Sequence, residues 1–146
     1  MLIADTRLEW SVARWNKLDP GLKDLAVMAS AAAIGCSWCM DFGYWESRRR
    51  GLSHEKLRDV PRWRDSEVYT PLERDVLEYS EAMTATPPAV EDELVERLRR
   101  CLGEAALVEL TAMVAVENLR SRMNSALGLS SQGFKDRCEI PERAGA

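Results

Sequence analysis

Apolar side chains recur at helical spacing along most of the chain, and residues typical of helix ends bound each run. Asp19 followed by Pro20 is a typical helix start, and Thr70 with Glu73 forms a capping box. Glycines stand where several runs end. Together these signals predict helices from Pro20 to Ile34, from about Cys36 to Gly51, from Ser53 to about Asp59, from Thr70 to Met83, from beyond Pro88 to Gly103, and from about Glu104 to Leu127.

The last of these helices is apolar almost all round over residues 105–116, which predicts that neighbouring helices bury it on several sides. No stretch alternates apolar and polar residues in the way that a half-buried strand does. The pattern therefore predicts an all-α protein of six or seven helices. No linker or repeat divides residues 1–146, so we expect a single domain with a loosely held, flexible tail at 139–146.

The composition is that of a globular domain and excludes several other classes. Of the 146 residues, 46% are apolar and 30% are charged, which is too apolar for a disordered chain. The net charge of −4 disfavours general binding to nucleic acid or to an anionic membrane. The longest apolar stretch has 12 residues, too few to cross a bilayer, and the N-terminus lacks the apolar core of a signal peptide. We therefore expect a cytoplasmic protein.

One segment departs from this acidic balance. Residues 48–64 contain seven basic and two acidic side chains. No nucleic-acid-binding motif accompanies them, so the segment is expected to form a solvated surface or a contact between subunits.

The most informative feature is the pair Cys36 and Cys39 in a C-x-x-C motif at the predicted start of a helix. A helix N-terminus stabilises a thiolate through its free N–H groups and its partial positive charge. The spacing places both sulfurs on one face, close enough for a disulfide, so that one sulfur can resolve the oxidised form of the other. The alternative is that both cysteines act as small buried apolar residues near Trp38.

A metal site is not expected. Zinc needs two further ligands at paired spacing, whereas His54, Cys101 and Cys138 are isolated in the sequence. No other cofactor is indicated. Cys101 and Cys138 are also expected to remain unpaired with each other.

Several stretches resemble the carboxymuconolactone decarboxylase and alkylhydroperoxidase D (AhpD-like) superfamily. They are LDPGLKDL at 18–25, GCSWC at 35–39, YTPLER at 69–74, YSEAMT at 79–84 and NLRSRMNSALG at 118–128. They cover most of residues 18–128, in the order that the family has. The resemblance implies an all-α fold, a homo-oligomer (commonly a trimer or hexamer) and reduction of hydroperoxides by the cysteine pair.

The resemblance also assigns roles to individual residues. It implies that Cys39 becomes the sulfenic acid and that Cys36 is its resolving partner and proton donor. Peroxidase members carry a glutamate twelve residues before the first cysteine and a histidine four residues after the second. Here these positions are Asp24 and Gly43. Asp24 can still relay a proton, but the histidine is absent.

Three functions follow from these features. The first is a thiol-dependent hydroperoxide reductase that uses Cys36, Cys39 and Asp24 and takes electrons from a dithiol partner. The second is a binding or scaffold protein that kept the fold and lost efficient catalysis, which the absence of the histidine favours. A cofactor-free lyase acting on a small lactone acid is a minor alternative. If the first is right, we expect slow turnover at neutral pH, and Gly43→His should raise it provided that the ring fits.

Other side chains are candidates for the substrate cleft. They are Trp38, Glu46 and His54, which lie close to the cysteine pair in the sequence. Each also has a structural interpretation: Trp38 as core or subunit interface, Glu46 as the i, i+4 partner of Arg50, and His54 as an exposed residue at a helix start.

Further along the chain, Asn118 and Arg122 are expected to make structural hydrogen bonds or ion pairs. The apolar last helix and the five tryptophans indicate that the protein is not a monomer.

Overall fold

The computed structural model describes residues 2–138, with the side chains at 2, 5, 137 and 138 left out of the description. The expected flexible tail at 139–146 therefore lies outside the described residues. The described part is all α-helical, without strands, and contains α1 Leu2–Val12, α2 Pro20–Ile34, α3 Ser37–Arg49, α4 His54–Asp59, α5 Pro71–Thr84, α6 Asp92–Leu102, α7 Glu104–Ala126 and the 3₁₀ helices η1 Val60–Asp65 and η2 Lys135–Cys138. This confirms the predicted fold class and places six helices where the pattern puts them. The helix α1 and both 3₁₀ helices were not located from the sequence.

The predicted end signals make the hydrogen bonds that define the helices. At the start of α2, Asp19 Oδ1 accepts N–H groups from Gly21 at 2.8 Å and Leu22 at 3.2 Å. Both hydrogen bonds of the capping box between Thr70 and Glu73 are present at α5.

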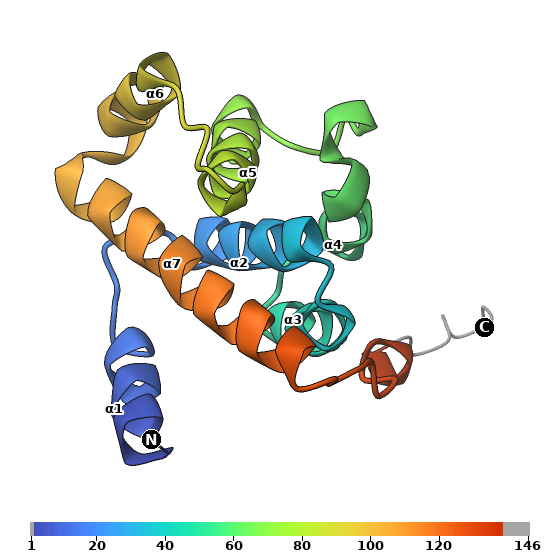
Figure 1. The fold of residues 1–146 in the computed structure, drawn as a ribbon. Coiled ribbons are helices and arrows are strands. Elements are labelled where there is room, and N and C mark those ends of the chain that lie inside the picture. The colour runs from blue at the N-terminus through green and yellow to red at the C-terminus, as the bar shows by residue number, and fades with distance from the viewer. Residues whose placement is uncertain (1, 139–146) are drawn as a thin grey trace, which may run out of the picture.

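The helix α2 lies at the centre of the molecule, between α5 and η1 on one side and α3 on the other, and α7 crosses it (Figure 1). Eight of its 15 residues are buried, and the alanines and other small side chains among them let its neighbours approach. One apolar cluster joins α2 to α5, α6 and α7 through residues that include Leu22, Ala26, Val76, Leu98 and Leu110. A second joins α2 to α3, α4, η1 and α5 through Leu25, Met28, Tyr44, Leu57 and Leu77 among others.

The long helix α7 is buried along one side and exposed along another. Its residues Met113 and Val116 pack against Val12 of α1, which covers part of the helix. Its amide side chain Asn118 donates to Thr84 Oγ1 at 2.8 Å, and Arg122 Nη2 donates to the Thr84 carbonyl at 3.2 Å. These bonds confirm the structural pairing expected of the two side chains.

Apolar side chains remain on the outer face of α7, where Val108, Leu119, Met123 and, just beyond the helix, Leu127 are exposed. The prediction that this helix is buried on several sides is therefore only partly confirmed within one chain. No helix of the described part is long and apolar enough to span a membrane.

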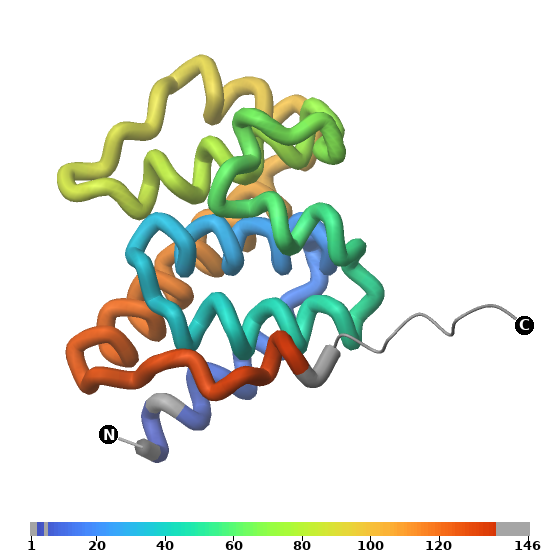
Figure 2. Tube along the Cα trace, turned by 90° about the vertical axis from the view of Figure 1, so that its right-hand side faces the viewer, coloured from blue at the N-terminus to red at the C-terminus, as the bar shows by residue number. Residues whose placement is uncertain are grey.

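After α7 the chain turns back and runs beside α3 (Figure 2). We call residues 129–135 the C-terminal strap. Its contacts with α3 are held mainly by one buried carboxylate, Asp41, which accepts N–H groups from Gln132 at 2.7 Å, Phe134 at 3.1 Å and Lys135 at 2.6 Å. The hydroxyl of Ser131 donates to the same carboxylate at 2.9 Å.

Candidate functional site

Cys36 and Cys39 lie at the N-terminus of α3 and are joined by a disulfide bond. Cys36 is the N-cap residue with an extended backbone, because Gly35 ends α2 in the left-handed conformation (φ 80°) and turns the chain. Its Sγ accepts the backbone N–H of Cys39 at 3.2 Å, so one sulfur bonds directly to a free N–H of the first turn. This confirms the prediction that the two cysteines lie at the start of a helix, close enough for a disulfide. Cys101 is exposed and unpaired, and the side chain of Cys138 lies outside the described part.

The disulfide lies in a mostly apolar environment. Cys36 is 1% exposed and Cys39 7% exposed, and both pack on Ala31 of α2 with Trp38 and Met40 alongside. One polar group from elsewhere in the chain approaches: the Nδ2 of Asn124, in the last turn of α7, donates to Cys39 Sγ at 3.4 Å. Sequence reasoning missed Asn124. The resemblance includes its stretch, but no spacing signal links residues 85 positions apart.

Asp24, the proposed proton relay, is not brought to the sulfurs. It lies on α2 eleven residues before Gly35, which corresponds to about 16 Å of helix rise. Its carboxylate is bound by Arg50, just beyond α3, through Nη2 at 2.5 Å and Nε at 3.1 Å. Burial raises the pKa of Asp24, and the hydrogen bonds and charge of Arg50 only partly offset this. Glu46 pairs with Arg50 at 2.7 Å, as its structural interpretation expects.

Gly43 of α3 packs directly against Met28 of α2. A Cβ atom built on Gly43 would stand 2.7 Å from the Sδ of Met28, a residue with no exposed surface. The absence of a side chain at this position therefore lets the two helices pack, and it does not open space for Glu46 or for water beside the cysteines.

His54 is half-buried, which corrects the expectation of an exposed histidine. Its Nδ1 forms a hydrogen bond with the hydroxyl of Tyr44, and the two rings meet edge to face. The pair links α4 to α3.

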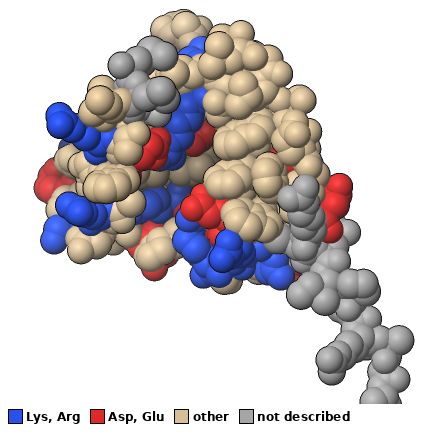
Figure 3. Space-filling view, turned by 90° about the horizontal axis from the view of Figure 1, so that it is seen from below, with Lys and Arg blue, Asp and Glu red and all other residues tan. Residues whose placement is uncertain are grey.

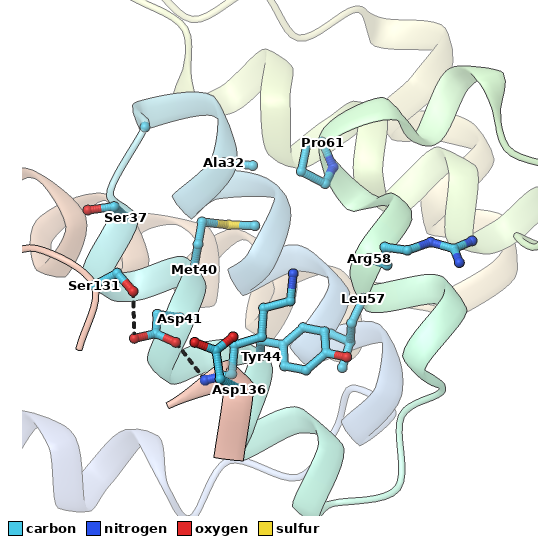
Figure 4. A pocket seen from close by; sticks show the side chains of 12 residues that line it. Ala32, Ser37, Met40, Asp41, Tyr44, Leu57, Arg58, Pro61, Ser131 and Asp136 are labelled. Atoms are coloured by element: carbon cyan, nitrogen blue, oxygen red, sulfur yellow. Dashed lines mark hydrogen bonds between the residues drawn. The ribbon is translucent and has the colours of Figure 1, made fainter. Parts of the chain in front are cut away.

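A cavity of about 450 Å³ lies on the other side of α3 from Cys39. At 100° per residue, Ser37, Asp41 and Tyr44 share one face of α3, and Cys39 points to the opposite face. Figure 4 shows Ser37, Asp41 and Ser131 on one side of this cavity and Leu57 and Arg58 on the other. The full lining comprises Ala32, Gly35, Ser37, Met40, Asp41, Tyr44, Leu57, Arg58, Pro61, Ser131, Lys135 and Asp136.

The hydrogen bonds of the C-terminal strap change the acidity of Asp41 at the edge of this cavity. Burial alone would raise the pKa of Asp41, but the hydrogen bonds from Lys135, Phe134, Ser131 and Gln132 outweigh it and place the pKa below its ordinary value. Aromatic contacts reinforce the strap: Phe134 packs edge to face on Phe42 and lies near Trp45. The carboxylate is thus charged and fully used in holding the strap.

The basic segment 48–64 is largely neutralised within the chain. Seen from below in Figure 3, basic side chains lie among acidic ones. The ion pairs of this segment are Arg50 with Asp24 and Glu46, Lys56 with Glu73, Arg58 and Arg62 with Asp59, and Arg64 with Glu81. The acidic partners lie mostly on other helices, so the local excess of positive charge in the sequence does not make a free basic patch. The described residues contain no group of three or more His, Cys, Asp or Glu side chains that could hold a metal ion.

Comparisons with solved structures identify the fold. ATU0492 of Agrobacterium tumefaciens, a protein of unknown function named as a candidate antioxidant defence protein AhpD, superposes with a TM-score of 0.80 at 28% identity over 86% of both chains. The debrominase Bmp8, in a variant bound to 2,3,4-tribromopyrrole, superposes with a TM-score of 0.82 over 93% of this chain and 73% of that one. At 21% identity the second likeness shows the shared fold alone.

Two relatives are similar in sequence. The uncharacterised protein YnjA of Escherichia coli (strain K12) is 37% identical over 134 residues, which are 92% of this chain and 72% of YnjA. The uncharacterised protein YdfG of Bacillus subtilis (strain 168) is 30% identical over 95 residues, which are 64% of this chain and 65% of YdfG. The model of the carboxymuconolactone decarboxylase family matches residues 2–82. With its AhpD-like helical fold and its cysteine pair at the start of α3, the chain belongs to the carboxymuconolactone decarboxylase family.

Proposed function

We propose that the protein is a thiol-dependent reductase of small hydroperoxides that cycles Cys36 and Cys39 between dithiol and disulfide. The observation that carries the proposal is the position of the pair: two sulfurs within bonding distance at a helix N-terminus, each accepting a hydrogen bond from an N–H group. Such donors stabilise the thiolate, which is the reactive form of cysteine.

The redox cycle has two chemical steps before reduction. The thiolate of Cys39, the more exposed of the two, attacks the terminal oxygen of ROOH. An S–O bond forms, the O–O bond breaks, and RO⁻ takes a proton to leave as ROH, so that sulfur loses two electrons and the peroxide gains them. The thiolate of Cys36 then attacks the sulfenic sulfur, the S–O bond breaks, and the departing hydroxide takes a proton to leave as water.

A dithiol returns the pair to its starting state. One of its thiolates attacks the protein disulfide and forms a mixed disulfide. Its second thiolate then resolves this bond, so the dithiol leaves as a disulfide and the cysteine pair has gained two electrons. Neither the cycle nor this exchange requires a metal or an organic cofactor.

The test is consumption of tert-butyl hydroperoxide with dithiothreitol as reductant. Cys39→Ser should abolish turnover. Cys36→Ser, treated with hydroperoxide after dithiothreitol has been removed, should stop after one turnover with a sulfenic acid that dimedone traps at Cys39. Cys101→Ser is the matched control, because Cys101 is exposed and unpaired, and it should behave like the wild type. Turnover by Cys39→Ser at the wild-type rate would refute the proposal.

A second candidate, a ligand-binding protein, is favoured by the cavity beside α3. Its volume of about 450 Å³ is in the range of small-molecule sites, and its apolar centre is formed by residues such as Met40, Leu57 and Pro61. If binding at this cavity is the function, small aromatic compounds should show saturable binding in ligand-observed NMR. Met40→Trp, which fills the cavity, should abolish that signal, and Cys39→Ser should leave it unchanged.

A further inference from the structure

Among the described residues, the side-chain amide of Asn124 is the hydrogen-bond donor that reaches the sulfur of Cys39 from outside its own helix. The Nδ2–Sγ distance is 3.4 Å, within the range of a hydrogen bond to sulfur. Of the other side chains packed on the cysteine pair, Ala31 and Met40 carry no N–H donor, and within the described residues the indole N–H of Trp38 makes no hydrogen bond to either sulfur.

We infer that Asn124 is a catalytic residue that donates a hydrogen bond to the Cys39 thiolate and so sets the pH range in which the protein reduces its substrate. This inference rests on the proposed hydroperoxide reductase function. Position 43, where peroxidase relatives are expected to carry a histidine, holds a glycine packed on Met28. The amide of Asn124 stabilises negative charge on sulfur but takes up no proton, so its role differs from that of a histidine.

The end of α7 fixes this amide in place. Gly128, with φ 73°, ends the helix in a Schellman motif. Its N–H donates to the Ser125 carbonyl at 3.1 Å, and the N–H of Leu129 donates to the Asn124 carbonyl at 2.9 Å. The backbone of Asn124 is therefore held at the point where the chain turns into the C-terminal strap, and its side chain reaches Cys39 from a fixed position.

The surroundings leave the two thiols of the reduced cysteine pair as the groups that titrate. Two ionisable side chains of α7 share the face of Asn124: Arg120 one turn earlier and Glu117 two turns earlier. They pair with each other, and Glu9 and Ser121 also bind them. On α3, Glu46 shares the face of Cys39 two turns later and is paired with Arg50, whereas Asp41 lies on the opposite face and is bound by the strap. On α2, Asp24 is far along the helix and paired with Arg50. The rate of Cys39 reactions should therefore follow the ionisation of the reduced cysteine pair, and in a Cys36→Ser background it should follow a single ionisation.

Asn124→Ala tests the inference through the pH dependence of alkylation of reduced Cys39 by iodoacetamide, read from fragment ions in mass spectrometry. Loss of one hydrogen bond to a thiolate should move the midpoint up by about one pH unit. The more basic thiolate is intrinsically about threefold more reactive, for a Brønsted coefficient of about 0.4–0.5. The rate at pH 7 should then fall about three- to fourfold, while the alkaline plateau rises about threefold.

This crossing of the two profiles separates the proposed role from structural damage, which would change the rate in the same direction at every pH. Asn124→Asp should shift the midpoint further upward, because a carboxylate repels the thiolate. Asn118→Ala is the matched control: it removes an amide from the same helix that bonds Thr84 and no cysteine, and its midpoint should equal that of the wild type.

Hydroperoxide consumption by the same variants distinguishes failure of the inference from failure of the proposed function. Wild-type turnover that depends on Cys39, together with an unshifted midpoint in Asn124→Ala, would overturn the role of Asn124 and leave the function intact. Absence of Cys39-dependent turnover in the wild type would refute the function. A shifted alkylation midpoint would then still show that Asn124 stabilises the thiolate.

Discussion

The contact between Gly43 and Met28 leads to a prediction opposite to the one that the sequence suggests. Alanine in a helix interior is ordinarily more stable than glycine by about 0.5–1 kcal/mol. In the structure, however, the new Cβ would lie 2.7 Å from Met28 Sδ, about 1 Å closer than the usual contact distance between nonbonded atoms. Gly43→Ala should therefore destabilise the protein.

The size of the expected change in the free energy of unfolding follows from two opposing contributions. Met28 is fully buried in the cluster that joins α2 to α3, so the sulfur cannot move away into solvent. Overpacking of this kind costs about 1–3 kcal/mol. After the gain in helix propensity is subtracted, the free energy of unfolding should fall by about 1 kcal/mol. For a chain of 146 residues this corresponds to a decrease in Tm of about 3 °C.

Urea unfolding followed by circular dichroism, at fixed protein concentration and with the disulfide intact, measures this change. A double-mutant cycle with Met28→Ala makes the test decisive, because removal of the Met28 side chain removes the clash. In the Met28→Ala background, Gly43→Ala should stabilise by about 0.5–1 kcal/mol, the opposite sign. An increase in stability on making Gly43→Ala in the wild type would show that the close contact does not govern this position.

The same contact changes the expectation for Gly43→His. The imidazole ring starts from a Cβ that already meets Met28, so this substitution should lower stability further and should not raise hydroperoxide turnover.

Four further predictions concern other parts of the molecule. Because the pKa of Asp41 is lowered on folding, its carboxylate stabilises the folded protein fully above the ordinary carboxyl pKa near 4, and this stabilisation is lost as the pH falls toward the folded-state pKa. Asp41→Ala should remove this acid sensitivity and speed tryptic cleavage within the C-terminal strap. Asp24→Ala should leave the pH midpoint of hydroperoxide consumption unchanged, because Asp24 is paired with Arg50 and with no sulfur. Light scattering should give a mass above the 16.5 kDa of one chain, and Leu119→Glu on the exposed apolar face of α7 should reduce it. Peptide mapping after mild oxidation should yield Cys36–Cys39 as the dominant disulfide.

The parts of the fold that could be predicted depend on interactions between residues close in sequence. Asp19, Thr70 with Glu73, and Gly128 act within one helical turn, so their effect is visible in the sequence itself. The helix α1 has no comparable end signals. It is held by side chains from α7, such as Arg120, which pairs with Glu9 across 111 positions. The position of α1 could therefore not be predicted from the local sequence pattern.

In the candidate site, too, the local interactions could be predicted from the sequence and the long-range ones could not. The geometry of Cys36 and Cys39 follows from their spacing at a helix start and was predicted. The contact of Asn124 with Cys39 and the pairing of Asp24 with Arg50 join distant segments, and they depend on how α7 and α3 pack against α2. An acidic residue at position 24 is compatible with either a proton relay or an ion pair, and only the packing distinguishes them.

The way in which Asp41 holds the C-terminal strap also determines which changes the strap can accept during evolution. Three of its four partners are backbone N–H groups, at Gln132, Phe134 and Lys135. A backbone donor is present whatever the side chain, so these hydrogen bonds survive most substitutions in the strap. Proline at any of the three positions removes a donor, and deletion of a single residue displaces the donors together. Among relatives with an aspartate at this position, the strap should therefore vary in sequence apart from the aromatic residue at 134, while keeping its length and excluding proline at these three positions.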